Sequence, residues 1–350
     1  MTIDYRAMGY AKRFMESFDI LPGFCELFSD EPYVALDSIG IPYRPEELQY
    51  ILTDNGICAR YPGTIIDNFL TQWNDVYRSI EHDMHHRSIA QNKKLTSWQN
   101  KIKEKNKAEK LGDKMYIPMA FELTQGCSVG CDFCGFCSKR LTGIYESNAY
   151  NIKLFEKILD VSMTMIGSAA GHGILYYATE PLDNPHYEDF ANIVLERTGV
   201  LPQITTAVPL RNTERMKKIL YQLNNNPRTV YRFSVRSFED FFEIYNTFAP
   251  EELLYVIMLS RFPECGTFIP AGRRGIATKE YNETIACVAG FVVNMVSKTI
   301  SMRYPCHADE LHPTGEVILR TDTFRDAVEY GDKLNEMIDK LDTYIDTPIQ

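Results

Sequence analysis

The feature that most constrains this chain is a group of cysteines between residues 127 and 137. Cys127, Cys131 and Cys134 follow the spacing Cys-x3-Cys-x2-Cys at the end of an apolar, strand-like run, and Cys137 comes shortly after them. Cysteine thiolates hold iron–sulfur clusters, usually four to a cubane. Three thiolates on one tight loop would leave one iron without a protein ligand. The pattern therefore predicts a cluster with one iron open to a small chelating molecule.

The same cysteines allow two other interpretations. Structural zinc prefers four ligands in a closed tetrahedral site, which Cys137 would complete. However, such sites usually pair two separated cysteine knuckles, and the sequence has no second knuckle. A disulfide needs an oxidising compartment, which nothing in the sequence indicates. We expect an iron–sulfur cluster with Cys137 as a bystander thiol, and a zinc site stays the alternative.

With the aromatic Phe133 before the third cysteine, this loop resembles that of the radical S-adenosylmethionine enzymes. The resemblance implies a [4Fe-4S] cluster held by Cys127, Cys131 and Cys134, with S-adenosylmethionine chelating the open iron. In such enzymes an electron from the reduced cluster splits the sulfonium and starts hydrogen abstraction from a substrate carbon. The resemblance also implies an α/β fold, a partial (β/α)6 TIM-like barrel with its chemistry at the carboxyl ends of the strands.

Composition narrows the class of protein only broadly. With 45% hydrophobic and 24% charged residues, the chain is typical of globular proteins. A formal net charge of −10 argues against nucleic acid as a partner. No apolar run reaches about 20 residues, and the first residues lack an apolar signal core, so we expect no membrane span and no export. We therefore expect a cytoplasmic protein with reduced cysteines.

The hydrophobic pattern divides the chain into three predicted parts. Residues 1–112 have mainly helical periodicity and form a helical N-terminal region, which Gly112 ends. Residues 113–305 form the predicted barrel, and residues 306–350 form a C-terminal extension with a hairpin and a helix. Within residues 93–110, seven lysines indicate a solvated helix face or a docking strip for an acidic peptide. The nearby histidines 82, 85 and 86 are expected to be solvated.

Within the predicted barrel, β-rich runs alternate with helical ones, as in a parallel sheet covered by helices. The predicted strands are residues 116–124, 173–179, 203–208, 229–235, 253–259 and either 285–296 or 300–304. The predicted helices start near residues 151, 186, 212, 237 and 279.

Several residues at the ends of these strands are candidate cofactor ligands. Glu180 follows the second strand, where radical S-adenosylmethionine enzymes typically have Gly-Gly-Glu-Pro, and its carboxylate would hold the cofactor's ammonium group. Ala178 and Thr179 replace the two glycines. Ser234 would bond a ribose hydroxyl and Arg236 the methionine carboxylate. Further candidate contacts are Thr205, Thr206 and Arg273.

Several segments also resemble one subgroup, the peptide-maturing epimerases of the proteusin type. They include 39–42, 126–131, 177–185, 289–295 and Pro305-Cys306. This resemblance implies L-to-D epimerisation of residues in a ribosomally made precursor peptide, which in such systems often has a long leader. It also implies an electron donor such as flavodoxin or ferredoxin, and leaves room for an accessory protein that binds the leader.

Epimerisation requires a hydrogen donor on the far side of the substrate radical, and a thiol is suitable. We expect Cys306 to be this donor, with His307 tuning it. The other candidates are Cys265, Cys287, Cys25 and Cys58. Two alternatives remain: a radical peptide lyase or splicing enzyme acting next to tyrosine, which needs no donor thiol, and a peptide-binding module with a structural metal.

Overall fold

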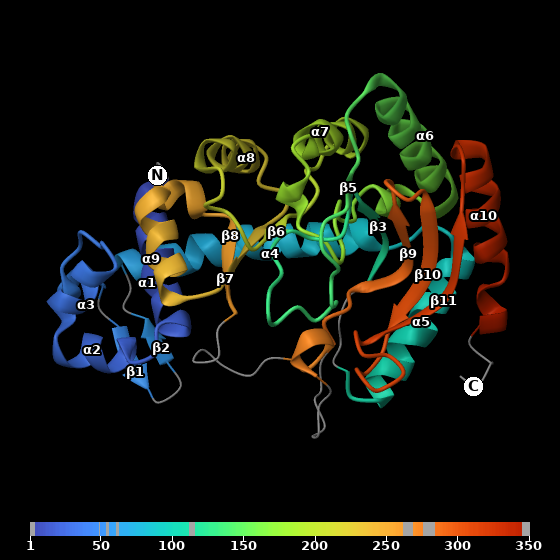
Figure 1. Cartoon of the computed structure of the whole chain (residues 1–350). Coiled ribbons are helices and arrows are strands. Elements are labelled where there is room, and N and C mark those ends of the chain that lie inside the picture. Colours follow the sequence, from blue (N-terminus) through green and yellow to red (C-terminus); the bar gives the residue numbers. More distant parts are fainter. Residues whose placement is uncertain are drawn as a thin grey trace. The chain divides into compact units, whose positions relative to one another are not determined.

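The computed structural model describes residues 4–48, 50–53, 56–60, 63–111, 116–261, 269–275 and 284–344. They form a mixed α/β protein with two compact units (Figure 1). Unit 1 comprises Met1–His82 and Thr205–Phe268, and unit 2 comprises Asp83–Ile204 and Ile269–Gln350. Each unit combines two separate stretches of the chain. The predicted three-part division remains a prediction drawn from sequence pattern.

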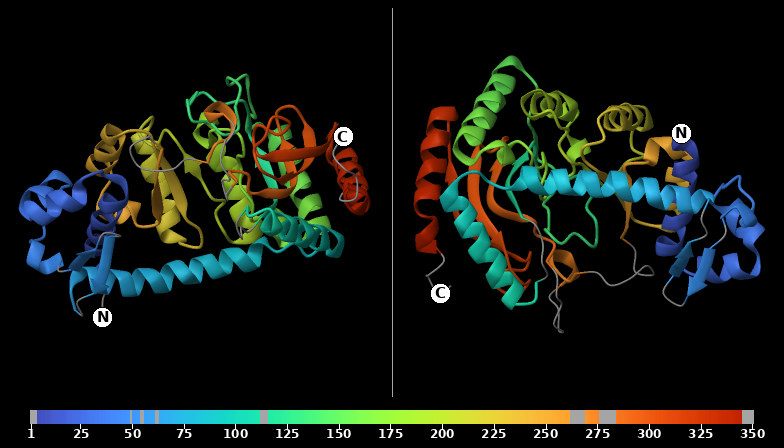
Figure 2. Two further views of the ribbon diagram at one scale, coloured as in Figure 1. Left: turned by 90° about the horizontal axis from the view of Figure 1, so that it is seen from below. Right: turned by 180° about the vertical axis from the view of Figure 1, so that it is seen from behind.

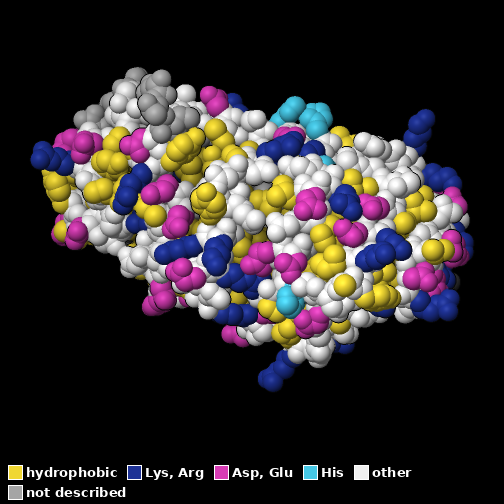
Figure 3. Space-filling view, turned by 90° about the horizontal axis from the view of Figure 1, so that it is seen from above, with side chains coloured by type: hydrophobic (Ala, Val, Ile, Leu, Met, Phe, Trp, Pro, Cys, Tyr) yellow, Lys and Arg dark blue, Asp and Glu magenta, His cyan; other side chains and the backbone are white. Residues whose placement is uncertain are grey.

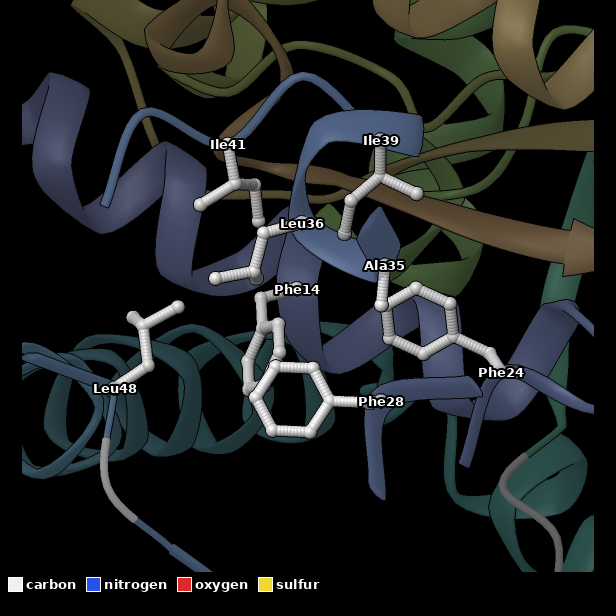
Figure 4. Close-up of a cluster of buried hydrophobic side chains, with 8 residues drawn as sticks. All are labelled: Phe14, Phe24, Phe28, Ala35, Leu36, Ile39, Ile41 and Leu48. Carbon is white, nitrogen blue, oxygen red and sulfur yellow. The ribbon is translucent and has the colours of Figure 1, made fainter. Parts of the chain in front are cut away.

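The N-terminal helices of unit 1 pack around aromatic side chains. α1 (Tyr5–Ile20) begins after Asp4, whose carboxylate accepts a hydrogen bond from the Ala7 N–H at 2.9 Å and so satisfies a free donor of the first turn. α2 (Phe24–Asp30), α3 (Pro32–Ser38) and the 3₁₀ helix η1 (Pro45–Leu48) follow. The buried cluster in Figure 4 holds these elements together, and Phe14 at its centre is fully buried. Replacing such a side chain by alanine typically costs about 3–5 kcal/mol.

One segment of the N-terminal region differs from the helical prediction. β1 (Tyr50–Thr53) and β2 (Gly56–Arg60) pair antiparallel as a hairpin. A signal was present in the sequence, because the strands carry β-branched and aromatic residues, which favour extended structure.

The sheet of unit 1 is parallel, with the order β6-β7-β8. It contains β6 (Thr205–Thr206), β7 (Tyr231–Val235) and β8 (Val256–Ser260). α8 (Thr213–Asn225) connects β6 to β7, and α9 (Phe238–Thr247) and η4 (Pro250–Leu253) connect β7 to β8. Parallel neighbours require such crossover connections, because the chain must return to the same end of the sheet, and a helix usually provides them.

Helix α1 protects the outer edge of this sheet. Among the described strands, β8 pairs only with β7, so its other edge would expose unpaired N–H groups. Glu16 of α1 accepts a hydrogen bond from the Met258 N–H at 3.3 Å. The buried Lys12 ammonium lies 2.6 Å from the same carboxylate and compensates its charge. The helix thus takes the place of a further strand.

The sheet of unit 2 has the order β11-β10-β9-β3. β3 (Ile117–Glu122) and β9 (Val288–Asn294) are parallel, whereas β10 (Thr299–Pro305) and β11 (Glu316–Thr323) run antiparallel to their neighbours. Beyond β3, single parallel bridges join Ala120 to Ile174 and Ile174 to Gln203.

Three helices cover one face of this sheet, as Figures 1 and 2 show: α5 (Lys93–Ala108), α6 (Ala149–Ile166) and α10 (Ala327–Asp339). Aromatic contacts hold two of these helices against the sheet. The ring centroids of Trp98 of α5 and Tyr304 are 6.1 Å apart, and those of Phe155 of α6 and Phe121 are 5.6 Å apart. We call this the helix face and the opposite side the loop face.

The remaining elements are short, apart from two helices. α4 (Ile65–Ser88) carries the three histidines, all at least partly exposed, and α7 (Tyr187–Thr198) follows the second predicted strand. The others are β4 (Thr124–Gln125), β5 (Gly143–Ile144), η2 (Ser168–Ala170), η3 (Pro181–Asp183), η6 (Gly272–Arg274) and η7 (Leu341–Tyr344). No helix within the described ranges is both long enough and apolar enough to span a membrane.

Most predicted elements are present, with one clear exception. Residues 173–179 do not form a strand, because only Ile174 pairs with its neighbours and glycine and bends surround it. Both alternatives for the last strand exist, as β9 and β10. Gly112 and the helix expected near residue 279 lie outside the described residues. The structure confirms an α/β fold, and the partial barrel remains a prediction.

Candidate functional site

The cysteine loop leaves the sheet of unit 2 just after β3 and is closed by main-chain contacts. The Cys127 N–H donates to the Lys139 carbonyl oxygen at 2.9 Å, and Cys127 forms a parallel bridge with Arg140. Gly126 has a φ of +85°, and a Cβ there would lie 2.2 Å from the Arg140 carbonyl oxygen. Only glycine permits this closure.

Inside the loop, successive turns place a hydrogen-bond donor at a cysteine sulfur. The Cys134 N–H donates to the Cys131 carbonyl oxygen, and the Cys137 N–H to that of Cys134, each at 3.2 Å. The Ser138 N–H donates to the Cys134 Sγ at 3.4 Å, and the Ser138 hydroxyl, which donates to the Ala178 carbonyl oxygen, lies 3.4 Å from the same sulfur. The loop thus holds a main-chain donor against this sulfur.

Arg273 ties the loop together from outside. Its guanidinium donates to the carbonyl oxygens of Cys131 at 2.7 Å and Ser138 at 2.5 Å, and its main-chain N–H donates to that of Cys134 at 3.0 Å. Gly272, with a φ of +63°, makes this approach possible, because a Cβ would lie 2.4 Å from the Cys134 carbonyl oxygen. The sequence marked Arg273 only as a loop contact.

The segment after Glu180 holds the start of the loop. Asp183 accepts hydrogen bonds from the N–H and the hydroxyl of Ser128, at 2.7 and 2.5 Å. Asn184 donates to the carbonyl oxygens of Leu123 at 2.9 Å and Tyr145 at 3.0 Å. The predicted ligand Glu180 is buried, and one of its carboxylate oxygens accepts from the Leu182 N–H at 3.1 Å.

The loop also packs on the loop face of the sheet. The Phe136 and Tyr177 rings have centroids 4.8 Å apart, and the Ser138 hydroxyl donates to the Ala178 carbonyl oxygen at 2.5 Å. The Ala178 N–H in turn donates to Glu122 of β3 at 3.0 Å. Segment 177–178 therefore links the cysteine loop to the sheet through both main chain and side chains.

Beneath Tyr177 lies a buried polar network. The Tyr177 hydroxyl donates to one carboxylate oxygen of Glu316 at 2.6 Å. Arg303 donates to the other oxygen of the same carboxylate, also at 2.6 Å. Arg303 also donates to Ser301 at 2.5 Å. Burial, followed by the charge of Glu316, raises the pKa of Tyr177 well above its ordinary value, so the phenol stays protonated. No local sequence pattern predicts this network, because its contacts join residues of β10, β11 and a turn that is distant in the sequence.

The donor set of the loop fits an iron–sulfur cluster by number and type. Cys127, Cys131 and Cys134 are half-buried thiols that form no disulfide. Burial raises the pKa of Cys127, so ligation would have to displace a proton there. Within the described ranges, no three His, Cys, Asp or Glu side chains are arranged as a preformed metal site. Phe133, beside the third cysteine, has the Arg274 guanidinium 5.2 Å from its ring centre.

The other predicted cofactor ligands, Thr205, Ser234 and Arg236, belong to unit 1. Thr205 pairs with Arg232 in the parallel ladder, and Ser234 lies further along the same strand. Arg236 donates to Asp240 at 3.1 Å, which holds its guanidinium in an ion pair. Within unit 1, the structure therefore places Thr205 and Ser234 on adjacent strands and Arg236 directly after β7.

The candidate donor thiols Cys306 and Cys287 both belong to unit 2. Cys306 follows β10 and is buried near the charged groups of Asp309, Lys105 and Glu316, and its Sγ donates to the His307 carbonyl oxygen at 3.2 Å. Burial raises the pKa of Cys306 to about 12. Cys287 instead packs against the apolar cluster on the loop face, together with Phe136.

The structure describes fewer contacts for the remaining candidate thiols. Cys25 is half-buried on α2. Cys265 lies outside the described residues, and so does the side chain of Cys58. His307 contacts the Glu109 carbonyl oxygen at 2.7 Å.

Two of the α5 lysines are engaged within unit 2. Lys94 pairs with Asp339 at 2.7 Å and Lys101 with Asp342 at 3.2 Å. On the face shown in Figure 3, basic and acidic side chains are interspersed, so the visible side chains form no continuous basic surface.

Comparison with known proteins identifies one clear relative. No protein-family model matches the chain. A solved structure, BtrN in complex with AdoMet and 2-DOIA, aligns with a TM-score of 0.40 and 14% identity over 67% of this chain and 87% of that one. At that level the likeness supports no conclusion. The uncharacterized protein y4wI of Sinorhizobium fredii is 30% identical over 96% of this chain and 70% of its own length. The chain therefore belongs to the same protein family as y4wI.

Proposed function

We propose that this protein is a radical S-adenosylmethionine enzyme. The observation that supports the proposal best is the construction of the cysteine loop. Three thiols follow a sheet strand, the Ser138 N–H donates to the Cys134 sulfur, and Arg273 holds the surrounding carbonyl groups. The main chain of the loop is held in this way, and its three thiols, which are not arranged as a preformed metal site, would turn toward one another when a cluster binds.

The chain's own residues would bind and orient the cofactors. Cys127, Cys131 and Cys134 would hold a [4Fe-4S] cluster, and Glu180 would accept the ammonium group of S-adenosylmethionine. When bound, the cluster and cofactor supply an electron and a hydrogen-abstracting group. Thr205, Ser234 and Arg236 are proposed to bind the ribose and carboxylate of the cofactor. Arg236 would have to leave Asp240 or share its charge with it.

We further propose that the substrate is a ribosomally made precursor peptide and that the reaction is epimerisation at Cα. The substrate would lose a hydrogen atom from one face and receive one from a thiol on the other. The sulfur radical left behind would regain one electron and one proton, with flavodoxin or ferredoxin as the electron source. Cys306 remains protonated at neutral pH, as a hydrogen-atom donor must. Cys287 is the second candidate, because it packs on the loop face.

A radical lyase or splicing reaction is the second candidate function. The observation that favours it is the burial of Cys306, whose Sγ already donates to the His307 carbonyl oxygen at 3.2 Å. A lyase needs no donor thiol. Both reactions fit a peptide with an acidic leader that docks along α5, with or without an accessory leader-binding protein.

One experiment separates these functions. The reconstituted enzyme is incubated with a candidate precursor peptide and S-adenosylmethionine in heavy water. Epimerisation predicts that modified residues gain one deuterium each and become D-residues, whereas lyase chemistry predicts a loss of mass. A peptide that binds but is returned unchanged, without consumption of S-adenosylmethionine, would instead indicate a binding module. Cys306→Ala and Cys287→Ala identify the donor, because loss of the donor stops inversion while cofactor cleavage continues.

A further inference from the structure

One face of the parallel sheet in unit 1 carries a row of polar side chains. In the ladder, Thr205 pairs with Arg232 and Arg232 with Ile257, while Ser234 pairs with Leu259. Paired residues in neighbouring strands share a face, and so do alternate residues along one strand. Thr205, Arg232 and Ser234 therefore lie on the same face, and the buried Phe233 points to the other.

Arg261 extends this row. It follows the last residue of β8, and its N–H donates to the Val235 carbonyl oxygen at 2.7 Å, which continues the parallel pairing. By the same alternation, Arg261 shares the face of Leu259 and hence of Ser234 and Arg232. Burial lowers the pKa of Arg261, and the positive charge of nearby Arg232 lowers it further.

Within the part of unit 1 that the structure describes, the two guanidinium groups lack the partners that Arg13 and Arg236 have. Arg13 donates to the carbonyl oxygens of Ile39 and Tyr245, and Arg236 is paired with Asp240 at 3.1 Å. Among the described residues, no hydrogen bond or ion pair engages the side chain of Arg232 or Arg261. Arg232 lies near Tyr77, which is hydrogen-bonded to Glu81. Two partly buried like charges repel each other, so an anion bound between the guanidinium groups would stabilise them.

The surroundings indicate which anion would fit. Guanidinium groups bind carboxylates and phosphates through paired hydrogen bonds. Ser234 and Arg261 lie toward the carboxyl ends of their parallel strands, where such sheets bind ligands, and Arg232 lies near the start of β7 on the same face. The net charge of −10 opposes the approach of a polyanion, which favours a single carboxylate over a phosphate-rich ligand.

We propose that Arg232 and Arg261 form a binding site for a carboxylate of the substrate, an acidic side chain of the peptide. This deepens the proposed function and rests on it for the identity of the ligand. The site would select peptides with an acidic residue near the position that is modified.

The test uses the full chain without cluster or cofactor, and a fluorescein-labelled alanine-rich model peptide with a single glutamate. Its glutamine counterpart is the matched control peptide. We expect the glutamate peptide to bind about tenfold more tightly than the glutamine peptide, and R232Q or R261Q to remove that preference. R6Q, a change at an exposed arginine of the same unit, should preserve it. Equal binding of both peptides, or an unchanged preference in R261Q, would overturn the proposal.

Three further measurements distinguish a substrate carboxylate from a cofactor, a phosphate or a structural partner. R261Q should melt no lower than the wild type, because the change relieves like-charge repulsion; a much lower melting temperature would show a structural partner and contradict the proposal. Competition by S-adenosylmethionine would assign the site to the cofactor, and stronger competition by inorganic phosphate than by acetate would assign it to phosphate. Either result would contradict the proposal that the site binds a carboxylate of the substrate.

A protein that binds the glutamate peptide but never cleaves S-adenosylmethionine would refute the proposed function, but it would not contradict this binding site.

Discussion

The guanidinium of Arg273 donates a hydrogen bond to the main-chain carbonyl oxygen of Cys131 across 2.7 Å. The same side chain reaches the Ser138 carbonyl oxygen at 2.5 Å, so a single residue from a distant part of the sequence spans the cysteine loop. A planar guanidinium suits this task, because its donors point in fixed directions and lysine offers only a point charge.

The first prediction concerns this clamp. Arg273→Lys should loosen the loop without unfolding unit 2, because it removes two side-chain hydrogen bonds and keeps the charge. Amide hydrogen exchange over residues 127–140 should become faster in the apo-protein, and less iron should be retained on reconstitution. R325K, a change at an exposed arginine paired with Glu329, is the control. Unchanged exchange in R273K would contradict the clamp.

The second prediction concerns the link between the loop and the sheet. Tyr177→Phe keeps the ring against Phe136 but removes the hydroxyl that donates to Glu316 at 2.6 Å. Because a buried carboxylate loses a partner, the free energy of unfolding should fall by about 1–3 kcal/mol. Urea unfolding measures this, with Y150F at an exposed position as the control. A loss equal to that of Y150F would show that the hydroxyl bond contributes nothing.

The third prediction is a pH dependence. Burial raises the pKa of Glu122 above its ordinary value of 4.5, although hydrogen bonds from Asn294 and Ala178 oppose the shift. Between pH 4.5 and the raised pKa, the native state binds more protons than the unfolded state, so this group's stabilisation is lost as the pH rises.

The variant Glu122→Gln lacks this titration. Its free energy of unfolding relative to wild type should therefore increase as the pH rises from about 4.5 toward neutrality. Urea unfolding at several pH values measures the difference, and E26Q, a change at an exposed residue of α2, is the control. A constant difference between E122Q and wild type across that range would contradict the assignment.

The fourth prediction concerns thiol reactivity. Burial raises the pKa of Cys306 to about 12, so almost none of it is thiolate at neutral pH, whereas Cys137 is exposed. In the folded apo-protein, iodoacetamide should modify Cys137 long before Cys306. Mass spectrometry of peptides after timed alkylation measures both. Rapid labelling of Cys306 would show an accessible thiolate and remove the support that burial lends to a hydrogen-donor role.

The sequence was most informative where local pattern decides structure. The cysteine spacing and the apolar run before it located a strand and a loop, and helix starts near residues 186, 212 and 237 were correct because capping and periodicity are local signals. The hairpin of β1 and β2 was missed because a strong helical period surrounds it.

The supports of the site depend on contacts between distant residues, which no local pattern records. Glu316 meets Tyr177 only because β11 pairs with β10, and Arg273 meets Cys131 only because a glycine with a positive φ allows a close approach. Residues 173–179 looked like a strand from their composition. Bends at this position instead bring Tyr177 and Ala178 to the cysteine loop.

The central claim is that Cys127, Cys131 and Cys134 hold a cluster that cleaves S-adenosylmethionine. The most direct measurement reconstitutes the protein anaerobically with iron and sulfide, adds a strong reductant and S-adenosylmethionine, and quantifies bound metal and 5′-deoxyadenosine. We predict about four irons per chain and steady formation of 5′-deoxyadenosine, both lost in Cys134→Ala. Protein that retains zinc in place of iron, or that forms no 5′-deoxyadenosine with its cluster reduced, would contradict the account.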